Sequence, residues 1–203
     1  NKERRYGWFP SISGGWVPTQ YDWYRNLLPF NNFLKFRASW GRVGNDRLKD
    51  ENGNDIRFPY LTTLGNVSST WGTGLAENRT GSMNLKWEVS TKTNFGIDAR
   101  FFDDKVDMTV DFFHTKTTDI FQRRANIPDE GGLSNVLPYA NIGSMKSWGM
   151  DGTLAYTHTF NKDMALTVRG NFTHAENEVI YWEQSGVNYP YQSNSGVPYK
   201  VQR

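Results

Sequence analysis

The segment KDENGNDIR (Lys49–Arg57) carries oxygen-bearing side chains at the spacing of a calcium-binding loop. Positions one, three and five of such a loop would be Asp50, Asn52 and Asn54. Position six is Asp55, where the loop requires glycine, and position twelve is Leu61, where it requires a bidentate glutamate. The segment is therefore interpreted as an ordinary Asn-Gly turn, and no metal site is predicted.

Other residues that could perform chemistry form no recognisable pattern. The three histidines fall on different predicted strands or strand ends, without metal-ligand spacing on one element: His114, His158 and His174. The paired carboxylates Asp103-Asp104 and Asp129-Glu130 lie in turn-like contexts, which favour solvated turns over general acid–base catalysis. Cysteine is absent, and no nucleophile motif or phosphate-binding glycine loop occurs. An enzyme is the least favoured class, and no catalytic residue or cofactor is predicted.

The composition combines low hydropathy with many aromatic residues. Of 203 residues, 37% are hydrophobic and 15% aromatic, with eight tryptophans, while the mean hydropathy is −0.69. This balance suits a barrel with one polar face and also a sugar-binding sandwich. The net charge is +2 without a basic cluster, so no nucleic-acid partner is predicted. No run of about 18 apolar residues occurs, so no transmembrane helix is predicted, but membrane strands stay open.

Strands are the elements that would position any functional residue. In WEVSTKTNFGIDARFF (Trp87–Phe102), apolar and polar side chains alternate from Phe95 on, which is the period of a strand. Similar alternation predicts six strands, at about Arg5–Val17, Leu34–Arg42, Trp87–Phe102, Val106–Thr115, Ser147–Thr159 and Met164–Thr173. Each has about ten residues or more, the length that a tilted strand needs to cross a bilayer. Asp22–Leu28 is predicted to form one short helical turn.

The polar faces of these strands carry full charges in mid-strand. The residues concerned are Lys35, Arg37, Asp98, Arg100, Asp107, Asp111 and Arg169. A soluble sandwich would expose such a face to bulk solvent, whereas a large barrel would direct it into a water-filled lumen. The prediction for these seven side chains is that they face a lumen.

The connections between the predicted strands alternate in length. Two are short, Asp103–Lys105 and Asn161–Asp163, and Pro18–Phe33 is of moderate length. The others are long: Val43–Glu88, Lys116–Lys146 and the segment from Ala175 to Arg203. Outer-membrane barrels show this asymmetry, with short periplasmic turns and long outer loops.

The aromatic residues divide into two groups. Those on strands suit a membrane-interface girdle, with ordinary sheet packing as the alternative: Trp8, Trp16, Trp40, Trp148, Tyr156 and Phe172. Those in the expected outer loops could contact cargo or a partner protein, with packing inside the loops as the alternative: Trp71, Trp182, Tyr189 and Tyr191.

Five ordered segments resemble one family, the SusC/RagA-type TonB-dependent outer-membrane transporters of Bacteroidetes. They are RYGWFPSISGGW (Arg5–Trp16), LKFRASWGRVGN (Leu34–Asn45), NLKWEVSTKTNFGID (Asn84–Asp98), VDMTVDFFHTKTTDIF (Val106–Phe121) and NIGSMKSWGMDGTL (Asn141–Leu154). The resemblance runs from about Arg5 to Val179 and concerns the later part of the barrel. It implies an all-β fold, here an incomplete segment of about six antiparallel strands of a large transmembrane β-barrel with long outer loops.

The resemblance also implies an outer-membrane importer of oligosaccharide or peptide. Its partners would be a SusD-like surface lipoprotein, membrane lipid and the TonB-ExbB-ExbD machinery, which acts through an N-terminal part. The sequence shows neither the family's plug nor its TonB box, and six strands are too few to close a transmembrane barrel, which needs about eight. Residues 1–203 are therefore interpreted as a fragment of a TonB-dependent receptor β-barrel domain without the plug.

Two rival hypotheses remain open from the sequence. A soluble β-sandwich that binds carbohydrate would fold without detergent. A small porin-like barrel would need at least two further strands from the long loops or from Ala175–Arg203.

Overall fold

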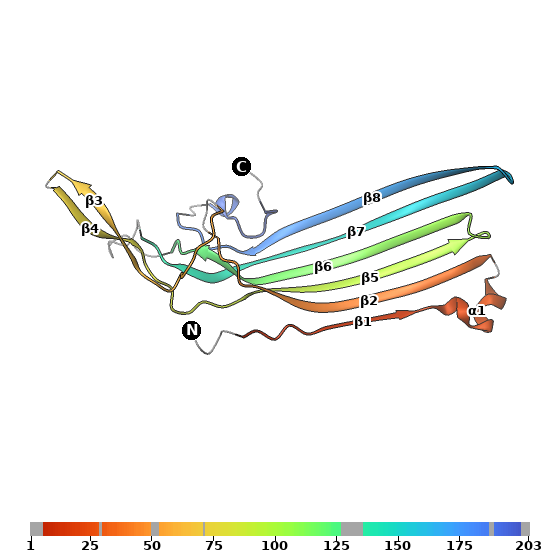
Figure 1. Cartoon of the computed structure of the whole chain (residues 1–203), viewed down its shortest axis with the longest axis horizontal. Helices are drawn as coiled ribbons and strands as arrows, with labels where there is room; N and C mark the ends of the chain where they lie inside the picture. Colours follow the sequence, from red (N-terminus) through yellow and green to blue (C-terminus); the bar gives the residue numbers. More distant parts are fainter. Residues whose placement is uncertain are drawn as a thin grey trace.

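The computed structural model describes residues 6–28, 30–49, 53–70, 72–126, 136–186 and 189–199. They form one long six-stranded sheet and a separate two-stranded hairpin (Figure 1). The sheet order is β1-β2-β5-β6-β7-β8, and all neighbouring strands are antiparallel. The strands are β1 (Ser11–Trp16), β2 (Asn31–Asn45), β5 (Glu88–Phe101), β6 (Val106–Arg123), β7 (Tyr139–Asn161) and β8 (Met164–Tyr181). Within the six-stranded sheet, each strand pairs with the strand before it and the strand after it in the chain, and β2 pairs with β5 because the hairpin lies outside this sheet.

The strands are longer than predicted at the end that leads into the long connections. β6 continues to Arg123 and β7 begins at Tyr139, so the predicted loop Lys116–Lys146 is wrong over much of its length. β2 and β8 also continue, to Asn45 and Tyr181. The prediction stopped where the apolar alternation stopped. Backbone pairing continues beyond that point because ladder hydrogen bonds do not require an apolar face.

β1 is shorter than predicted. The alternation predicted a strand over Arg5–Val17, but the regular strand is Ser11–Trp16, and Arg5 lies outside the described residues. Pro10 cannot donate a ladder hydrogen bond, and β1 lies at the edge of the sheet, where pairing on one side only makes a strand less regular. Only its pairing with β2 fixes its register, from Ser11 opposite Gly41 to Trp16 opposite Phe36.

The predicted loop Val43–Glu88 contains a hairpin that the sequence reading missed. β3 (Thr63–Ser69) pairs with β4 (Gly72–Arg79), and the hairpin projects beyond the end of the main sheet (Figure 1). The segment is rich in Gly, Asn, Ser and Thr, which are the residues of loops, and both of its faces are largely exposed. No buried face imposed an apolar alternation that would have revealed it.

The short connections lie together at one end of the sheet. Residues 102–105 join β5 to β6, and residues 162–163 join β7 to β8 (Figure 1). Phe102, Asp103 and Asp104 all have positive φ, as a tight turn between antiparallel strands often requires. The predicted helical turn is confirmed as α1 (Asp22–Leu27), after the short 3-10 helix η2 (Pro18–Gln20), at the same end. The long connections lie at the opposite end, as predicted.

The main sheet is a single layer with little core. Few hydrophobic side chains are buried among the described residues: Tyr24, Ala99, Ala155 and Val179. An apolar row crosses five strands from Phe36 through Ile97, Val110 and Gly152 to Phe172. The flanking Phe95 and Phe112 remain 42% and 44% exposed. Within the described part of the chain no second sheet covers this face, so a β-sandwich is not formed there. No helix in that part is long and apolar enough to span a membrane.

Candidate functional site

The strand register places all seven predicted charges on one face of the sheet, opposite the apolar row. Lys35 pairs with Asp98, and Arg100 with Asp107. Arg37 and Asp111 both pair with Gly96, from opposite sides, and Asp107 pairs through Ala155 with Arg169. This surface is called the charged face below. The sequence alone grouped these residues strand by strand, whereas the register shows that they form one continuous surface.

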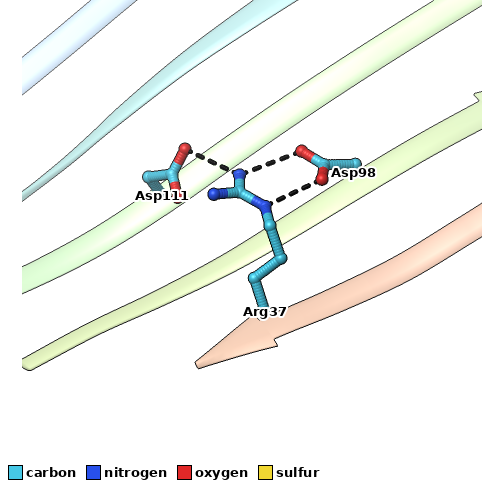
Figure 2. Close-up of polar contacts among 3 residues, drawn as sticks. All are labelled: Arg37, Asp98 and Asp111. Carbon is cyan, nitrogen blue, oxygen red and sulfur yellow. Dashed lines mark hydrogen bonds and ion pairs between the residues drawn. The ribbon is translucent and has the colours of Figure 1, made fainter. Parts of the chain in front are cut away.

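Arg37 is the centre of an ion network on the charged face. Its Nε donates to Oδ2 of Asp98 at 2.8 Å and its Nη2 to Oδ1 at 2.9 Å, which is a bidentate pair (Figure 2). Nη2 also donates to Oδ2 of Asp111 at 3.1 Å. The guanidinium thus links β2 to β5 and β6. Planar, two-pronged donors of this kind fix geometry better than a lysine could.

Gly96 lies directly beneath this network. It lies between Arg37 and Asp111 in the register, and the guanidinium passes over it. A Cβ at position 96 would come within 2.7 Å of Nη2 of Arg37 and closer still to the Asp111 carboxylate. A larger residue at this position would therefore force the ends of the Arg37 and Asp111 side chains to move, and glycine leaves the space that their contact occupies.

The remaining charges are held more loosely. Arg100 is 3.8 Å from Asp107 and 3.9 Å from Asp104, distances that leave the ions solvated. Within the described residues, Lys35 and Arg169 have no ion-pair partner. A polar hollow of about 620 Å³ lies over the Arg37 network and is lined by residues that include Lys35, Asn94 and Asp151. Such a surface can bind polar groups reversibly, but it contains no arrangement for covalent chemistry.

A second hollow lies at the opposite end of the sheet from the short turns. It measures about 720 Å³ and is called the loop-end cavity below. Its walls come from the outer ends of β6 and β7, the segment after β8 and Lys49 of the β2–β3 connection: Lys49, Ile120, Phe121, Gln122, Arg123, Arg124, Ala125, Leu137, Tyr139, Met145, Trp182, Glu183, Ser185 and Tyr199. Segments far apart in the sequence therefore meet here.

Glu183 ties two of these segments together. Its side chain is only 3% exposed, and the Arg124 guanidinium Nε approaches Oε2 to 2.8 Å. Oε1 accepts further hydrogen bonds from the backbone amides of Asn126 at 2.8 Å and Ala125 at 3.3 Å. Burial of the carboxylate raises the pKa of Glu183, but these hydrogen bonds outweigh burial and hold the pKa below its ordinary value. The carboxylate is thus an ionised connection between the loops that follow β6 and β8.

The four predicted loop aromatics have different positions. Trp182 lines the loop-end cavity and lies 6.1 Å, centroid to centroid, from Tyr199. Tyr189 and Tyr191 stack on each other at 5.4 Å with their outer surfaces exposed, and they do not line that cavity. Trp71 lies outside the described residues. Whether any of them contacts cargo or a partner stays a prediction.

The strand aromatics predicted as a girdle mostly share the apolar face. Trp16 pairs with Phe36, Trp40 with Ile12, and Tyr156 with Val168. Trp148 and Phe172 follow the same alternation on β7 and β8. Trp8 precedes β1 and is 84% exposed. Apart from Trp8, the register thus places these predicted girdle residues on the face opposite the seven predicted charges.

The sequence reading missed Gln122, Arg124 and Glu183. Arg124 directly follows β6, and Glu183 follows β8 by two residues. The two residues are far apart in the sequence and meet only in the folded chain, so no local spacing reveals their contact. The predicted Asn-Gly turn falls partly outside the described residues; on its two sides Lys49 and Asp55 form an isolated antiparallel β-bridge, and Gly53 has φ +83°. Asp55 pairs with Arg47 at 2.8 Å, while Asp50 and Asn52 lie outside the described residues. In the described part of the chain, no cluster of three potential metal ligands occurs.

An open antiparallel sheet with one apolar and one charged face defines part of a large transmembrane β-barrel. The chain belongs to the TonB-dependent receptor-like β-barrel family, which matches residues 1–200. The resemblance to this class, stated from the sequence, is confirmed.

Individual relatives are consistent with this assignment. A TonB-dependent receptor of Formosa agariphila is 33% identical over 179 residues, covering 88% of this chain and 16% of the relative. The TonB-dependent receptor SusC of Bacteroides thetaiotaomicron is 27% identical, covering 88% of this chain and 18% of the relative. The RagAB peptide importer in its open-open state superposes with a TM-score of 0.70 and 25% identity, covering 87% of this chain and 18% of that chain. This chain thus spans less than a fifth of each relative. The names of these relatives are those of receptors and importers.

Proposed function

We propose that this chain forms consecutive strands of the barrel of a TonB-dependent importer in the bacterial outer membrane. The observation that carries the proposal is the division of the sheet into an exposed apolar face and a charged face. In a barrel the first would contact lipid and the second a wet lumen. The names of the related receptors and of the RagAB importer support uptake as the activity.

The dimensions of the apolar face support a membrane position. Along β7 this face runs from Trp148 to Tyr156, an interval of eight residues or roughly 26 Å of strand at about 3.3 Å per residue, which a barrel tilt of about 40° reduces to roughly 20 Å of height. An outer-membrane barrel has an apolar band about 25 Å tall with aromatic girdles at both edges. Beyond Trp148 the same face continues with Lys146, which pairs with Glu178 at 2.8 Å. The change from rings to charges fits the edge of the band.

The outer edge of β8, opposite β7, supports a barrel with more strands than the six described here. After η4 (Pro190–Gln192) the chain turns back along β8, where the Val179 amide donates to the Val197 carbonyl at 2.9 Å. The Gly196 amide donates to the Val179 carbonyl at 2.7 Å, and the Tyr199 amide donates to Oδ1 of Asn177. This antiparallel pairing is how a further barrel strand would begin. At the other edge of the sheet, β1 would pair with the barrel strand that precedes it.

The mechanism proposed is energised uptake without covalent chemistry. Cargo, an oligosaccharide or a peptide, would bind between the long loops and pass along the charged face. A SusD-like surface lipoprotein would cover the loop end, and the TonB-ExbB-ExbD machinery would supply energy through a plug held by another part of the protein. Specificity would come from hydrogen bonds and aromatic stacking in hollows such as those described above.

The test is uptake by the source bacterium. Deleting the gene that encodes this chain is expected to abolish uptake of one class in a panel of labelled oligosaccharides and peptides, and restoring the gene should recover it. A strain without TonB should lose the same uptake. Unchanged uptake of the whole panel, together with absence of the chain from purified outer membranes, would contradict the proposal.

The lipoprotein partner needs a separate test. The tagged protein, cross-linked on intact cells and purified in detergent, is expected to retain a SusD-like lipoprotein in equal amount. A preparation without this companion would leave the importer proposal standing and would remove the partner from it.

A further inference from the structure

The apolar face of the main sheet ends in a row of basic side chains at its loop end. The register aligns Arg42 on β2, Thr91 on β5, Lys116 on β6 and Lys146 on β7. The alternation of side chains along each strand places them on the same face as the apolar row described above. Between this level and the short turns, the described residues of these four strands hold no lysine, arginine or carboxylate on that face. The four aligned residues are called the basic row below.

The neighbouring row, one step closer to the short turns, is bounded by two tryptophans. It runs from Trp40 on β2 through Thr93 and His114 to Trp148 on β7. Trp40 is 40% exposed, and the ring centroid of Trp148 lies 5.2 Å from Nζ of Lys146. Tryptophan prefers the headgroup level of a membrane, and long basic side chains extend from there into the polar headgroup region. In the proposed barrel the basic row therefore lies at the headgroups of the leaflet on the loop side.

Two of the three cations in the basic row have no partner for their charge. Within the described part of the chain, Arg42 and Lys116 are exposed, and their side chains form no ion pair or hydrogen bond. Lys146 differs, because its Nζ pairs with Oε2 of Glu178 at 2.8 Å. Glu176, in the neighbouring row, also lies on β8. The carboxylates thus lie at one side, and the positive charge over β2, β5 and β6 favours an anionic ligand.

Arg42 and Lys116 flank Thr91, each one strand away. Since neighbouring strands are about 4.8 Å apart, the backbones of the two basic residues are about 10 Å apart, and their long side chains can converge above Thr91. The guanidinium and the ammonium are donors only, and the threonine hydroxyl can donate as well. A phosphate group suits this set, because its free oxygens all accept hydrogen bonds and its charge is negative.

The surface next to the basic row favours a lipid over a free phosphate ion. Phe95 and Phe112 are register partners two rows closer to the short turns, and both keep much of their ring surface exposed. A ligand that reaches from Thr91 to these rings needs a phosphate at one end and an apolar chain at the other. An isolated phosphate ion gains nothing from the rings, whereas a lipid covers them with its acyl chains.

We infer that the basic row binds the phosphate headgroup of a membrane lipid in the leaflet on the loop side. Arg42 and Lys116 hold the phosphate, Thr91 donates a hydrogen bond to it, and the acyl chains lie along Phe95. The inference rests on the proposed function, since it takes the apolar face to contact lipid. It goes beyond that function, because it makes the rim of the barrel selective for anionic lipid that carries phosphate.

The test is fluorescence quenching by brominated lipid in the full-length protein that contains this chain. A fluorophore on Phe112→Cys, in a protein otherwise free of cysteine and reconstituted into phosphatidylcholine liposomes, reports the lipids that contact this part of the apolar face. A minor fraction of the lipid is brominated phosphatidic acid or, in parallel, brominated phosphatidylcholine, whose choline masks the phosphate charge. Phosphatidic acid is expected to occupy the site about tenfold more readily. Lys116→Gln should reduce this preference about fivefold, because each basic side chain near an anionic lipid contributes about that factor.

Lys92→Gln is the matched control. Lys92 follows Thr91 on β5, so it lies at the same level but on the charged face, and removing its charge should leave the preference unchanged. Thr91→Val, which keeps the size of the side chain, should lower the preference by a smaller factor without changing the unfolding temperature. Equal quenching by the two lipids, an unchanged preference in Lys116→Gln, or an equal loss in Lys92→Gln would each overturn the inference. Quenching by neither lipid would overturn it together with the lipid contact of the proposed function, so the two failures are distinguishable.

Discussion

At the scale of single residues, Arg37 fixes the geometry of the charged face. Replacing it by methionine leaves Asp98 and Asp111 without their shared cation, and these half-buried carboxylates then repel each other. We expect a loss of stability of about 1 kcal/mol, because the ion pairs are partly solvated. Arg37→Lys should recover only part of it, since an ammonium cannot make the two-pronged contact. The measurement is the temperature at which the folded protein loses its compact migration on a gel.

Gly96→Ala tests the same Arg37 network by adding a methyl group beneath the guanidinium. Its methyl group would displace the guanidinium, so the loss of stability should resemble that of Arg37→Met. In the double variant the two losses should not add, because both remove one interaction. Full additivity, measured by the same gel assay, would show that Gly96 serves the backbone and not the network.

Glu183 should be the most sensitive residue of the loop end. Glu183→Gln removes the partner of Arg124 and places an amide donor among existing donors. The cost is about 2 kcal/mol from the lost charge-assisted hydrogen bonds, because the Arg124 side chain is 38% exposed and its charge stays solvated. We expect local opening, seen as faster hydrogen exchange in residues 182–199 while exchange in β5 and β6 stays unchanged. Glu178→Gln, at a more exposed pair on β8, is the control and should have a much smaller effect.

The pH dependence of this connection follows from the direction of the Glu183 pKa. Since folding lowers that pKa, the stabilisation is fully present above the pKa of the unfolded chain, near 4.3, and is lost as pH falls through the lower folded pKa. The loops should therefore stay closed from pH 7 down to about 4.5 and open below that. Limited proteolysis of residues 182–199 across this range measures it, and opening already near pH 6 would disagree with the ionised, hydrogen-bonded carboxylate.

At the scale of elements, the sequence revealed strands where one face is apolar and failed where none is. The Phe95–Phe101 alternation and the short turns predicted β5 to β8 in order. The outer halves of β6 and β7 and the whole of β3–β4 lack that alternation, so pattern alone could not find them. The seven charged residues could be assigned to one face because they alternate with apolar residues along their strands. Glu183 and Gln122 could not be assigned, since their surroundings come from connections with no regular period.

The β3–β4 hairpin should be dispensable for the barrel. It makes regular backbone pairs only within itself, and its apolar Leu64 and Leu75 remain mostly exposed. Replacing residues 63–79 by a short Gly-Ser linker should leave the unfolding temperature of the full-length protein unchanged. A decrease of several degrees would mean that the hairpin packs on the barrel.

At the scale of the whole molecule, the two faces of the sheet should meet different solvents. These 203 residues contain no native cysteine, so one introduced cysteine can report on each face in a full-length protein whose remaining part is also free of cysteine. Val110 and Thr109 are neighbours on β6 and point to the apolar and the charged face. A fluorophore on Val110→Cys, in the full-length protein reconstituted into liposomes, is expected to be quenched by brominated lipid and protected from aqueous iodide. Thr109→Cys should show the reverse.

This pair of variants separates a barrel from a soluble sheet because only lipid contact produces the first result. A second protein layer over the apolar face would shield Val110→Cys from both quenchers. Solvent on both faces would let iodide reach both positions. Quenching by lipid should also decline along β7 from Leu154→Cys to Lys146→Cys, since the apolar face gives way to charge beyond Trp148. An unchanged lipid signal at Lys146→Cys would move the membrane edge outward and place the loop-end cavity close to the headgroups.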